Sequence, residues 1–300
     1  MNNGTTTRIS AIRAAYDHDE RQYPSEPGCK TTTIEGFTVT ACPDAGCAWI
    51  LSPPVPDSRV INRVRDAIRA IDPRITEVEW KCFSWDHEWD CSPGEFVGPA
   101  GDALSAAGFT AESGEAVLYR PVGTGAAEVR DPEYAVDREI IVRVAETAGD
   151  EKILDDADAI HSQVWSGKPL PRSYLERYWR ALERDTAAGV PEKAGVPGTE
   201  GARASIHVAY LEGRPVSYGR FQKNANSSFA GFWGGATIRA ARGRGAYRAL
   251  VHSRIAEARE YGCSWVMADA MVHTSMPILL RMGFLELGRT RPFIWRRTES

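Results

Sequence analysis

Apolar and polar positions along this 300-residue chain follow two alternating periods, which predicts helices and strands in mixed order. Apolar side chains recur at helical spacing from Val60 to Ile68, whereas the next segment, 75–84, alternates between its two faces as a strand does. In the first half, these patterns predict helices over 8–20, 57–70 and up to 109, and strands over 32–41, 47–52, 75–84 and 115–122. We therefore expect a mixed α/β protein.

The second half of the chain continues this mixture. A strand is predicted over 138–145, after which Gly149 and Asp150 supply a turn and the N-cap of a helix. A second helix is predicted after Pro171, because apolar side chains recur there at i, i+3, i+4 and i+7. The later predicted elements are strands over 204–211, 214–222 and 228–238, a helix to about 261, a strand over 264–270, a short helix over 275–282 and two final strands.

The segment 121–136 lacks a periodic apolar face and is rich in Gly, Pro and Ala, which predicts a linker. We place the boundary near residue 130, which divides the chain into domains 1–130 and 131–300. A second segment of this kind, 187–203, is predicted to be a loop.

The two predicted domains share one sequence feature. "ALSAAGF" ending at Phe109 and "ILLRMGF" ending at Phe284 are both predicted helices that close on Gly-Phe. Glycine suits the left-handed residue that ends a helix, and the phenylalanine can then return to the core. This similarity indicates that the halves are duplicated units.

Composition and net charge limit the class of protein and the partners that we expect. The chain has 43% hydrophobic and 25% charged residues, as soluble globular proteins do, and no apolar run approaches the ~20 residues that cross a bilayer. The N-terminal segment has no export signal, so we expect a cytoplasmic location and no membrane partner. The net charge of -4 argues against general nucleic-acid binding.

The six cysteines occur without a paired C-x-x-C spacing and are interpreted as free thiols. They are Cys29, Cys42, Cys47, Cys82, Cys91 and Cys263. The segment "CFSWDHEWDC" brings Cys82, His87 and Cys91 close together in sequence. Its spacing matches no common zinc module, so we expect no metal.

The segment "ARGRGAYRAL" joins a predicted strand to a predicted helix and has the features of a phosphate-binding loop. Gly243 and Gly245 permit close backbone approach, while Arg242 and Arg244 supply positive charge. The helix that starts near Gly245 presents unpaired N–H groups at the positive end of its dipole. A basic surface turn is the alternative interpretation, but the order of strand, glycine loop and helix favours phosphate.

This loop is followed by no Gly-Lys-Ser/Thr, and its G-x-G-x-x-G pattern is incomplete, which argues against nucleotide hydrolysis and hydride transfer. It resembles motif A of the Gcn5-related N-acetyltransferases, whose pattern is Arg/Gln-x-x-Gly-x-Gly/Ala. Arg242 and Gly245 fill the first two key positions, whereas Tyr247 stands where a small residue is usual. The resemblance covers 138–300 and includes "SWVMADA" as the fifth strand and "SMPILLRMGF" as the following helix.

The resemblance implies tandem domains, each a mixed and mostly antiparallel sheet flanked by helices, in a layout similar to that of mycothiol synthase-like actinobacterial acetyltransferases. In the C-terminal domain, two splayed strands would hold acetyl-CoA as co-substrate, with pantetheine against Thr237 and Ile238. The pyrophosphate would lie on Arg242, Gly243, Arg244, Gly245, Ala246 and Tyr247. In the N-terminal domain, the matching segment "LSPPVPDSRVINRV" has three prolines and no glycine, so we expect no cofactor there.

Two catalytic groups that are frequent in this family are missing here. The tyrosine that commonly protonates the leaving thiolate is replaced by Leu279, and the fourth predicted strand contains no glutamate base. Asp269, near the end of the fifth strand, is our first candidate for the base, with a structural carboxylate as the alternative. His273 and Ser275 are further catalytic candidates, with capping of the next helix as their alternative role.

We conclude that the chain is an acetyl-CoA-dependent N-acetyltransferase that acts by direct attack of an amine of a small molecule or peptide, as a monomer or homodimer. A catalytically silent acyl-CoA-binding module is one alternative, because the usual acid and base are absent. An aminoacyl-tRNA-dependent transferase of the related tandem type is another, but the intact loop and the acidic net charge count against it.

Replacement of Gly245 tests the loop assignment. We expect Gly245→Trp to abolish acetyl-CoA binding in calorimetry, because the indole would fill the space that a phosphate needs. Altering Cys82 or Cys91 should leave binding intact, and the reverse pattern would overturn the assignment.

Overall fold

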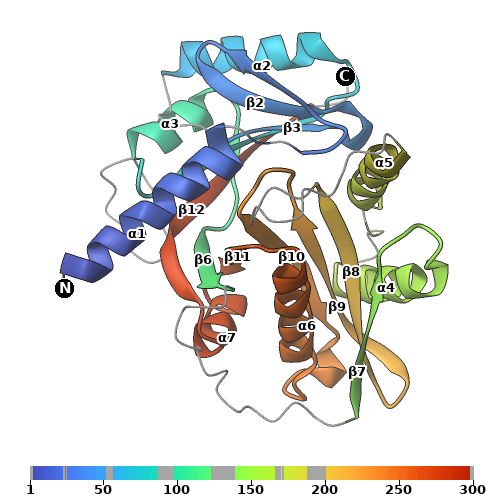
Figure 1. The fold of residues 1–300 in the computed structure, drawn as a ribbon. Helices are drawn as coiled ribbons and strands as arrows, with labels where there is room; N and C mark the ends of the chain where they lie inside the picture. Colours follow the sequence, from blue (N-terminus) through green and yellow to red (C-terminus); the bar gives the residue numbers. More distant parts are fainter. Residues whose placement is uncertain are drawn as a thin grey trace. The chain divides into compact units, whose positions relative to one another are not determined.

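A computed structural model describes residues 3–22, 24, 26–51, 57–86, 98–122, 139–165, 170, 172–187 and 201–297. These residues form the mixed α/β fold that the periodicity predicts, with mostly antiparallel strand pairs (Figure 1). They divide into two compact units, of which the first comprises Met1–Leu118, Asp269–Leu280 and Phe284–Ser300, and the second Tyr119–Ala268 and Arg281–Gly283. No helix in these described ranges is long and apolar enough to span a membrane.

The first unit contains a sheet in the order β1-β2-β3-β4-β12, with the short β5 also paired to β12. Only β3 and β4 run parallel in this group. Its strands are β1 (Lys30–Ile34), β2 (Phe37–Cys42), β3 (Cys47–Ile50), β4 (Glu77–Phe83), β5 (Thr110–Ala111), the first part of β6 (Glu115–Pro121) and β12 (Leu285–Arg296). Its helices are α1 (Asn3–Tyr16), continued by a π-helical turn (Asp17–Gln22), α2 (Ser58–Ile71), α3 (Pro99–Ala106) and most of α7 (Ser275–Arg281).

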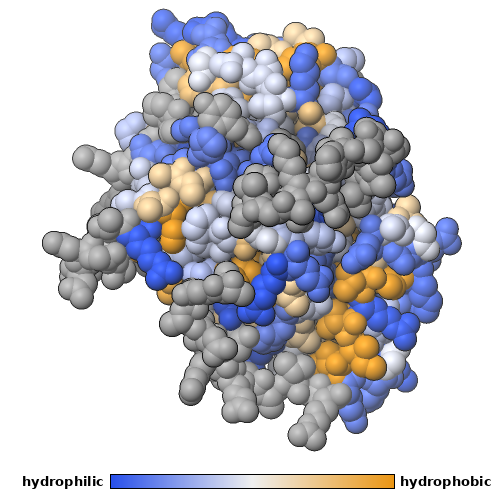
Figure 2. Space-filling view, in the orientation of Figure 1, coloured by the Kyte–Doolittle hydropathy of each residue, from blue (hydrophilic) through white to orange (hydrophobic). Residues whose placement is uncertain are grey.

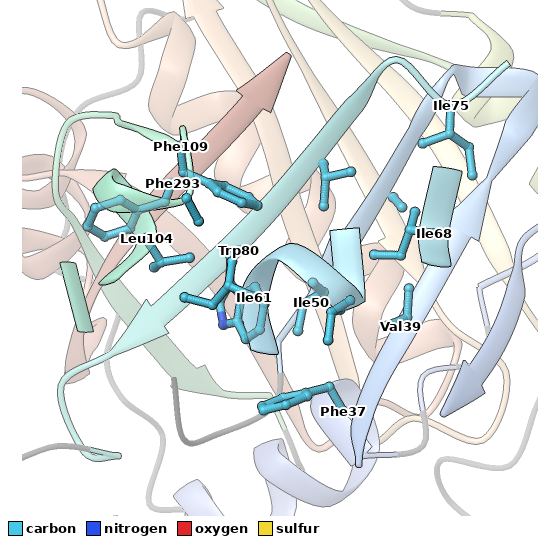
Figure 3. Close-up of a cluster of buried hydrophobic side chains, with 14 of the residues drawn as sticks. Phe37, Val39, Ile50, Ile61, Ile68, Ile75, Trp80, Leu104, Phe109 and Phe293 are labelled. Carbon is cyan, nitrogen blue, oxygen red and sulfur yellow. The ribbon is translucent and has the colours of Figure 1, made fainter. Parts of the chain in front are cut away.

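The core of the first unit forms between α2 and the sheet (Figure 3). Asp57 caps α2 because its carboxylate accepts hydrogen bonds from the amides of Arg59 and Val60. Ile61 and Ile68 then point from the helix toward the strands, and both side chains are fully buried. Trp80 of β4 lies at the centre of this cluster, where its ring contacts that of Phe37 edge-on at a centroid distance of 5.1 Å.

The second unit is built around strands β8, β9, β10 and β11, with β7 at the edge. Its strands are β7 (Ile140–Ala145), β8 (Arg203–Leu211), β9 (Arg214–Lys223), β10 (Phe229–Thr237) and the first part of β11 (Trp265–Met271), which passes into the first unit at Asp269. Its helices are α4 (Glu151–Val164), α5 (Ser173–Ala187), a short 3₁₀ turn (Arg239–Ala241) and α6 (Ala246–Glu260).

Strand β8 is buried on both faces because helices cover each of them. Ile206 and Val208 pack in the cluster that contains residues of α4 and α5, whereas Ala209 and Leu211 pack with α6. A strand with two covered faces reads as a continuous apolar run, as β8 does. Figure 2 shows an apolar patch on the surface of this unit. Ile141 of the edge strand β7 is 60% exposed.

Both predicted Gly-Phe helix ends are confirmed. Gly108 and Gly283 have φ values of +83° and +81°, and the amides of Phe109 and Phe284 donate to carbonyls five residues earlier. This is the hydrogen bond that closes a helix through a left-handed glycine, and both phenylalanine side chains are buried.

Three predicted elements differ from the structure. The strand predicted over 32–41 is a hairpin of β1 and β2, because Glu35 and Gly36 both have positive φ and reverse the chain. The two final strands are one continuous strand, β12. Asp150 makes no side-chain cap, because its carboxylate accepts instead from the amides of Glu146 and Thr147 in the preceding turn.

The predicted domain boundary near residue 130 lies outside the described residues, as do most of the predicted linker and positions 188–200 of the predicted loop. The two compact units also exchange a segment across this predicted boundary. The last strand of the chain, β12, belongs to the first unit, where Phe293 pairs with Trp80 of β4.

The interpretation of all six cysteines as free thiols is wrong for one pair. Cys29 and Cys42 form a disulfide, since the β1–β2 hairpin brings their Cα atoms to 4.4 Å. The spacing of the cysteines did not predict this disulfide, because the two residues meet only through the turn at Glu35 and Gly36, which was not predicted. Cys82 is a buried thiol whose pKa burial raises to about 12, which makes it unreactive. Cys91 and His87 lie outside the described residues.

The packing of α2 predicts unequal effects of two matched substitutions. Ile61→Ala should lower the free energy of unfolding by about 3 kcal/mol, because it leaves a cavity in a filled core. Ile71→Ala, on the same helix but 38% exposed, should cost less than about 1 kcal/mol. Urea unfolding followed by tryptophan fluorescence measures both, and equal losses would contradict this account of the core.

Candidate functional site

Strands β10 and β11 part within the second unit. Their parallel register joins only Phe229 to Trp265, Ala230 to Val266 and Gly231 to Met267, although both strands and the residues between them are fully described. The N–H and C=O groups of β10 beyond Gly231 therefore face an edge that β11 does not pair with. An extended chain could add to this edge by backbone hydrogen bonding.

A bulge accompanies the separation of the strands. The register between β10 and β9 shifts between Trp233 and Ala236, and Gly234 within the bulge has a φ of +60°. The next residue, Gly235, leaves room for the ring of Tyr247, because a Cβ built there would lie 2.7 Å from Tyr Cε2. Because residue 235 of β10 is a glycine, the large side chain of Tyr247 has space against the strand.

The predicted phosphate-binding loop follows β10 and the 3₁₀ turn. Gly243 and Gly245 have φ values of +81° and +89°, which side chains rarely adopt, and a Cβ at Gly243 would meet open space. Gly245 occupies the N-cap position of α6, and no side chain of the described residues caps this helix. The first helical hydrogen bond is donated by Ala249, so the amides of Ala246 and Tyr247 remain available at the N-terminus.

Positive charge surrounds these amides. Arg242 and Arg244 are exposed beside the loop, and Nε of Arg242 donates to the carbonyl of Thr237 at 3.3 Å. This bond ties the loop to the end of β10. Together with the N-terminus of a helix, exposed guanidinium groups suit an anion such as a phosphate.

The two residues predicted to meet pantetheine differ in what they can offer. The amide of Ile238 already donates to Val216, and its carbonyl accepts from Ala241. The Thr237 hydroxyl lies 2.7 Å from the Ser217 hydroxyl. The backbone edge available for a ligand therefore lies earlier on β10, between the last paired glycine and Thr237.

A buried polar network holds α6 against β8. The ring of His207 lies 2.8 Å from the Ser253 hydroxyl through Nδ1 and 2.6 Å from Glu257 through Nε2. Burial lowers the pKa of His207, although Glu257 opposes this effect. These contacts fix the helix whose N-terminus forms the loop.

Asp269 lies two residues beyond Met267, the last residue of β11 that pairs with β10. Its Oδ2 atom accepts a hydrogen bond from Nζ of Lys81 at 2.5 Å, and the same ammonium group lies 3.2 Å from Glu115. Asp269 thus belongs to the first unit, whereas the loop belongs to the second. The sequence did not single out Lys81 or Glu115, although Glu77, Glu79 and Lys81 form an unusual charged face on β4.

The other two catalytic candidates lie at the start of α7, where Ser275 is the first helical residue and His273 stands in the turn before it. Their catalytic role and the alternative capping role both stay predictions. Leu279, which stands where the sequence resemblance implies a tyrosine, is buried, and its carbonyl accepts a hydrogen bond from the amide of Phe284.

A separate pocket of about 240 Å³ opens between α4 and α5. Its lining comprises Ala148, Glu151, Leu154, Asp155, Arg172, Glu176 and Trp179. Carboxylates outnumber the one guanidinium, which pairs with Asp155 at 2.7 Å. This pocket therefore suits a cationic group better than a phosphate.

No protein-family model matches the chain. No curated protein matches it either. Among solved structures, it is similar to a GCN5-related N-acetyltransferase from Kribbella flavida, with a TM-score of 0.55, 14% identity and coverage of 98% of this chain and 95% of that one. A GCN5-related N-acetyltransferase from Sphaerobacter thermophilus matches with a TM-score of 0.53 and 13% identity, over 88% of this chain and 78% of that one.

A tandem GNAT protein from the clavulanic acid biosynthesis pathway matches over 100% of this chain and 97% of its own, with a TM-score of 0.50 and 13% identity. Identities this low establish the fold alone. The chain has the α/β fold of the GCN5-related N-acetyltransferase superfamily.

Proposed function

We propose that this protein is an acetyl-CoA-dependent N-acetyltransferase. The observation that carries the proposal is the N-terminus of α6, which no side chain caps and which follows two left-handed glycines and exposed arginines. The strand before this loop, β10, is not paired with β11 beyond Gly231. These features supply what a nucleotide thioester needs, which is an anion site for the diphosphate and an open strand edge for the amide-containing arm.

The cofactor assignment uses groups of the second unit only. The diphosphate would lie on the amides of Gly245, Ala246 and Tyr247, with Arg242, Gly243 and Arg244 beside it. The pantetheine amides would bond to the open edge of β10 before Thr237, and Ile238 would contribute its side chain rather than its occupied backbone groups.

The proposed chemistry is direct transfer. A neutral amine nitrogen attacks the thioester carbonyl, the new C–N bond forms, and the C–S bond breaks to release the CoA thiolate. Asp269 takes the proton that the acceptor nitrogen loses. Because Leu279 cannot donate a proton, the thiolate takes its proton from water.

A silent acyl-CoA-binding module is the second candidate, because Leu279 is buried and β10 carries no carboxylate. The decisive experiment follows thiol release from acetyl-CoA with a panel of small-molecule and peptide amines, and identifies acetylated products by mass. Saturable acetyl-CoA binding without thiol release across the panel would favour the silent module.

The contact between Gly235 and Tyr247 gives a specific prediction for the loop. We expect Gly235→Val to weaken acetyl-CoA binding at least about tenfold, because the new side chain displaces the Tyr247 ring at the first turn of α6. The double variant Gly235→Val with Tyr247→Ala should regain part of the affinity, since the collision is removed. Calorimetry measures all three proteins, and an unaffected single variant would argue against this loop as the cofactor site.

The role of Asp269 predicts a kinetic effect that is separate from binding. Asp269→Asn should lower kcat by about 100-fold, the size expected for loss of a general base, while the Kd for acetyl-CoA changes less than about twofold. Asp44→Asn, at an exposed ion pair with Arg74, is the matched control and should change neither. An unchanged kcat in Asp269→Asn would return this residue to a structural role.

A further inference from the structure

Three cysteines of the first unit lie in one row across its sheet. The register of β1 and β2 pairs Lys30 with Ala41. One position further out, Cys29 and Cys42 stand opposite each other and form the disulfide. On the other side of β2, Cys42 pairs with Cys47 of β3. Cys42 therefore has a cysteine as its direct neighbour on each of the two adjoining strands.

The three cysteine side chains project from the same face of the sheet. Ala41 of β2 and Ala48 of β3 belong to the apolar core that contains residues of α2. Because successive side chains of a strand alternate between faces, Cys42 and Cys47 both project from the face opposite this core. Cys29 shares that face, since residues that stand directly opposite on neighbouring antiparallel strands do so.

The spacing of the row suits a disulfide on either side of Cys42. The Cα atoms of Cys29 and Cys42 are 4.4 Å apart, close to the separation of about 4.5 Å in an antiparallel pair without mutual hydrogen bonds. The backbone groups of Cys42 then point toward β3, so its pair with Cys47 is of the hydrogen-bonded kind, with Cα atoms about 5.5 Å apart. Both separations lie within the range of about 4.4–6.8 Å that a disulfide spans.

The row also has the order that thiol–disulfide exchange requires. Cys47 carries a half-buried thiol outside the disulfide, whereas Cys42 is fully buried. Exchange needs no reagent to reach Cys42 from solvent, because the attacking sulfur belongs to the neighbouring strand. An attacking thiolate approaches a disulfide sulfur from the side opposite the leaving sulfur, and Cys47 and Cys29 flank Cys42 in this way.

We propose that the disulfide of Cys42 has two positions and that Cys47 is the internal nucleophile that moves it. The thiolate of Cys47 attacks Sγ of Cys42, the Cys42–Cys47 bond forms, and the Cys29–Cys42 bond breaks to release the thiolate of Cys29. Cys47 gives its proton to solvent before the attack, and Cys29 takes one from solvent afterwards. One disulfide and one thiol are present before and after, so no oxidant or reductant is consumed. This inference is independent of the proposed acetyl transfer.

Exchange moves the cross-link from one strand pair to the next. The Cys29–Cys42 bond ties the start of β1 to β2, and among the described strands β1 pairs with β2 alone. The Cys42–Cys47 bond instead closes the short turn between β2 and β3. Strand β1 then depends on its ladder with β2 and on the packing of Ile34 against the core. We therefore expect β1 to open more readily in the exchanged form.

The first experiment maps the disulfides of the unsubstituted protein. The protein is incubated at pH 8 under nitrogen, so that oxygen forms no new disulfide, and is then trapped with excess N-ethylmaleimide. Trypsin cuts after Lys30, and a protease specific for aspartate cuts before Asp44, which places the three cysteines on separate peptides. Mass spectrometry of the unreduced digest should find both disulfides, with labelled Cys29 in the same amount as the Cys42–Cys47 pair.

Two results of this mapping would overturn the proposal. One is label on Cys47 alone, with every Cys42 bound to Cys29. The other is the recovery of disulfides to Cys82 or Cys263, whose thiols are buried, because these would show scrambling through unfolding rather than exchange within the row.

Substitutions fix each position of the disulfide. Cys47→Ser removes the attacking thiol and should leave only the Cys29–Cys42 bond. Cys29→Ser, oxidised with glutathione disulfide, should form the Cys42–Cys47 bond, and thiols that stay unbonded at both positions would contradict the geometry of the row. Cys263→Ala, in the second unit, is the matched control and should show the same two disulfides as the unsubstituted protein. If Cys29→Ser does not fold, the mapping of the unsubstituted protein still decides the question.

Hydrogen exchange tests the consequence for β1. In the oxidised Cys29→Ser variant, the amides of Lys30–Ile34 should exchange at least about tenfold faster than in Cys47→Ser, because the cross-link no longer holds the start of the strand. The amides of α2 should exchange equally in both variants. Equal protection of β1 in the two variants would overturn its release by the exchange.

Discussion

The separation of β10 from β11 is the constraint on which the candidate site depends. Two strands that remained paired to their ends would satisfy each other's backbone groups and leave no edge for a ligand. Pairing with β11 ends at Gly231, a bulge in the pairing with β9 follows between Trp233 and Ala236, and the chain then turns through a glycine loop into α6. The unpaired edge and the helix N-terminus thus follow one another along the chain.

The glycine loop before α6 and strand β10 fit together through one large and one small residue. Tyr247 is large where the family pattern has a small residue, and Gly235 lacks the side chain that would collide with it. The buried contacts of His207 with Ser253 and Glu257 hold α6 on β8, so the N-terminal amides of the helix are carried by a rigid element. The large side chain of Tyr247 is therefore accommodated against β10 by the glycine at position 235.

The first unit depends on a different kind of interaction. Its apolar core lies between α2 and one face of the sheet, while β4 turns Glu79 and Lys81 to the other face. A charged group so far from water needs partners, and Lys81 finds them in Asp269 and Glu115. Oδ1 of Asp269 is buried beside these ion pairs and has no hydrogen-bond partner among the described residues.

The sequence by itself determined the local elements, because helical periodicity, the Asp57 cap and the two Gly-Phe helix ends act within a few residues. It also indicated the phosphate-binding loop, whose glycines and arginines are contiguous. The β1–β2 hairpin with its disulfide, the placement of β12 beside β4, and the meeting of Lys81 with Asp269 were decided only by tertiary structure. Each of these joins residues through strand pairing or side-chain contact, and neither periodicity nor spacing along the chain encodes which distant strand a residue will face.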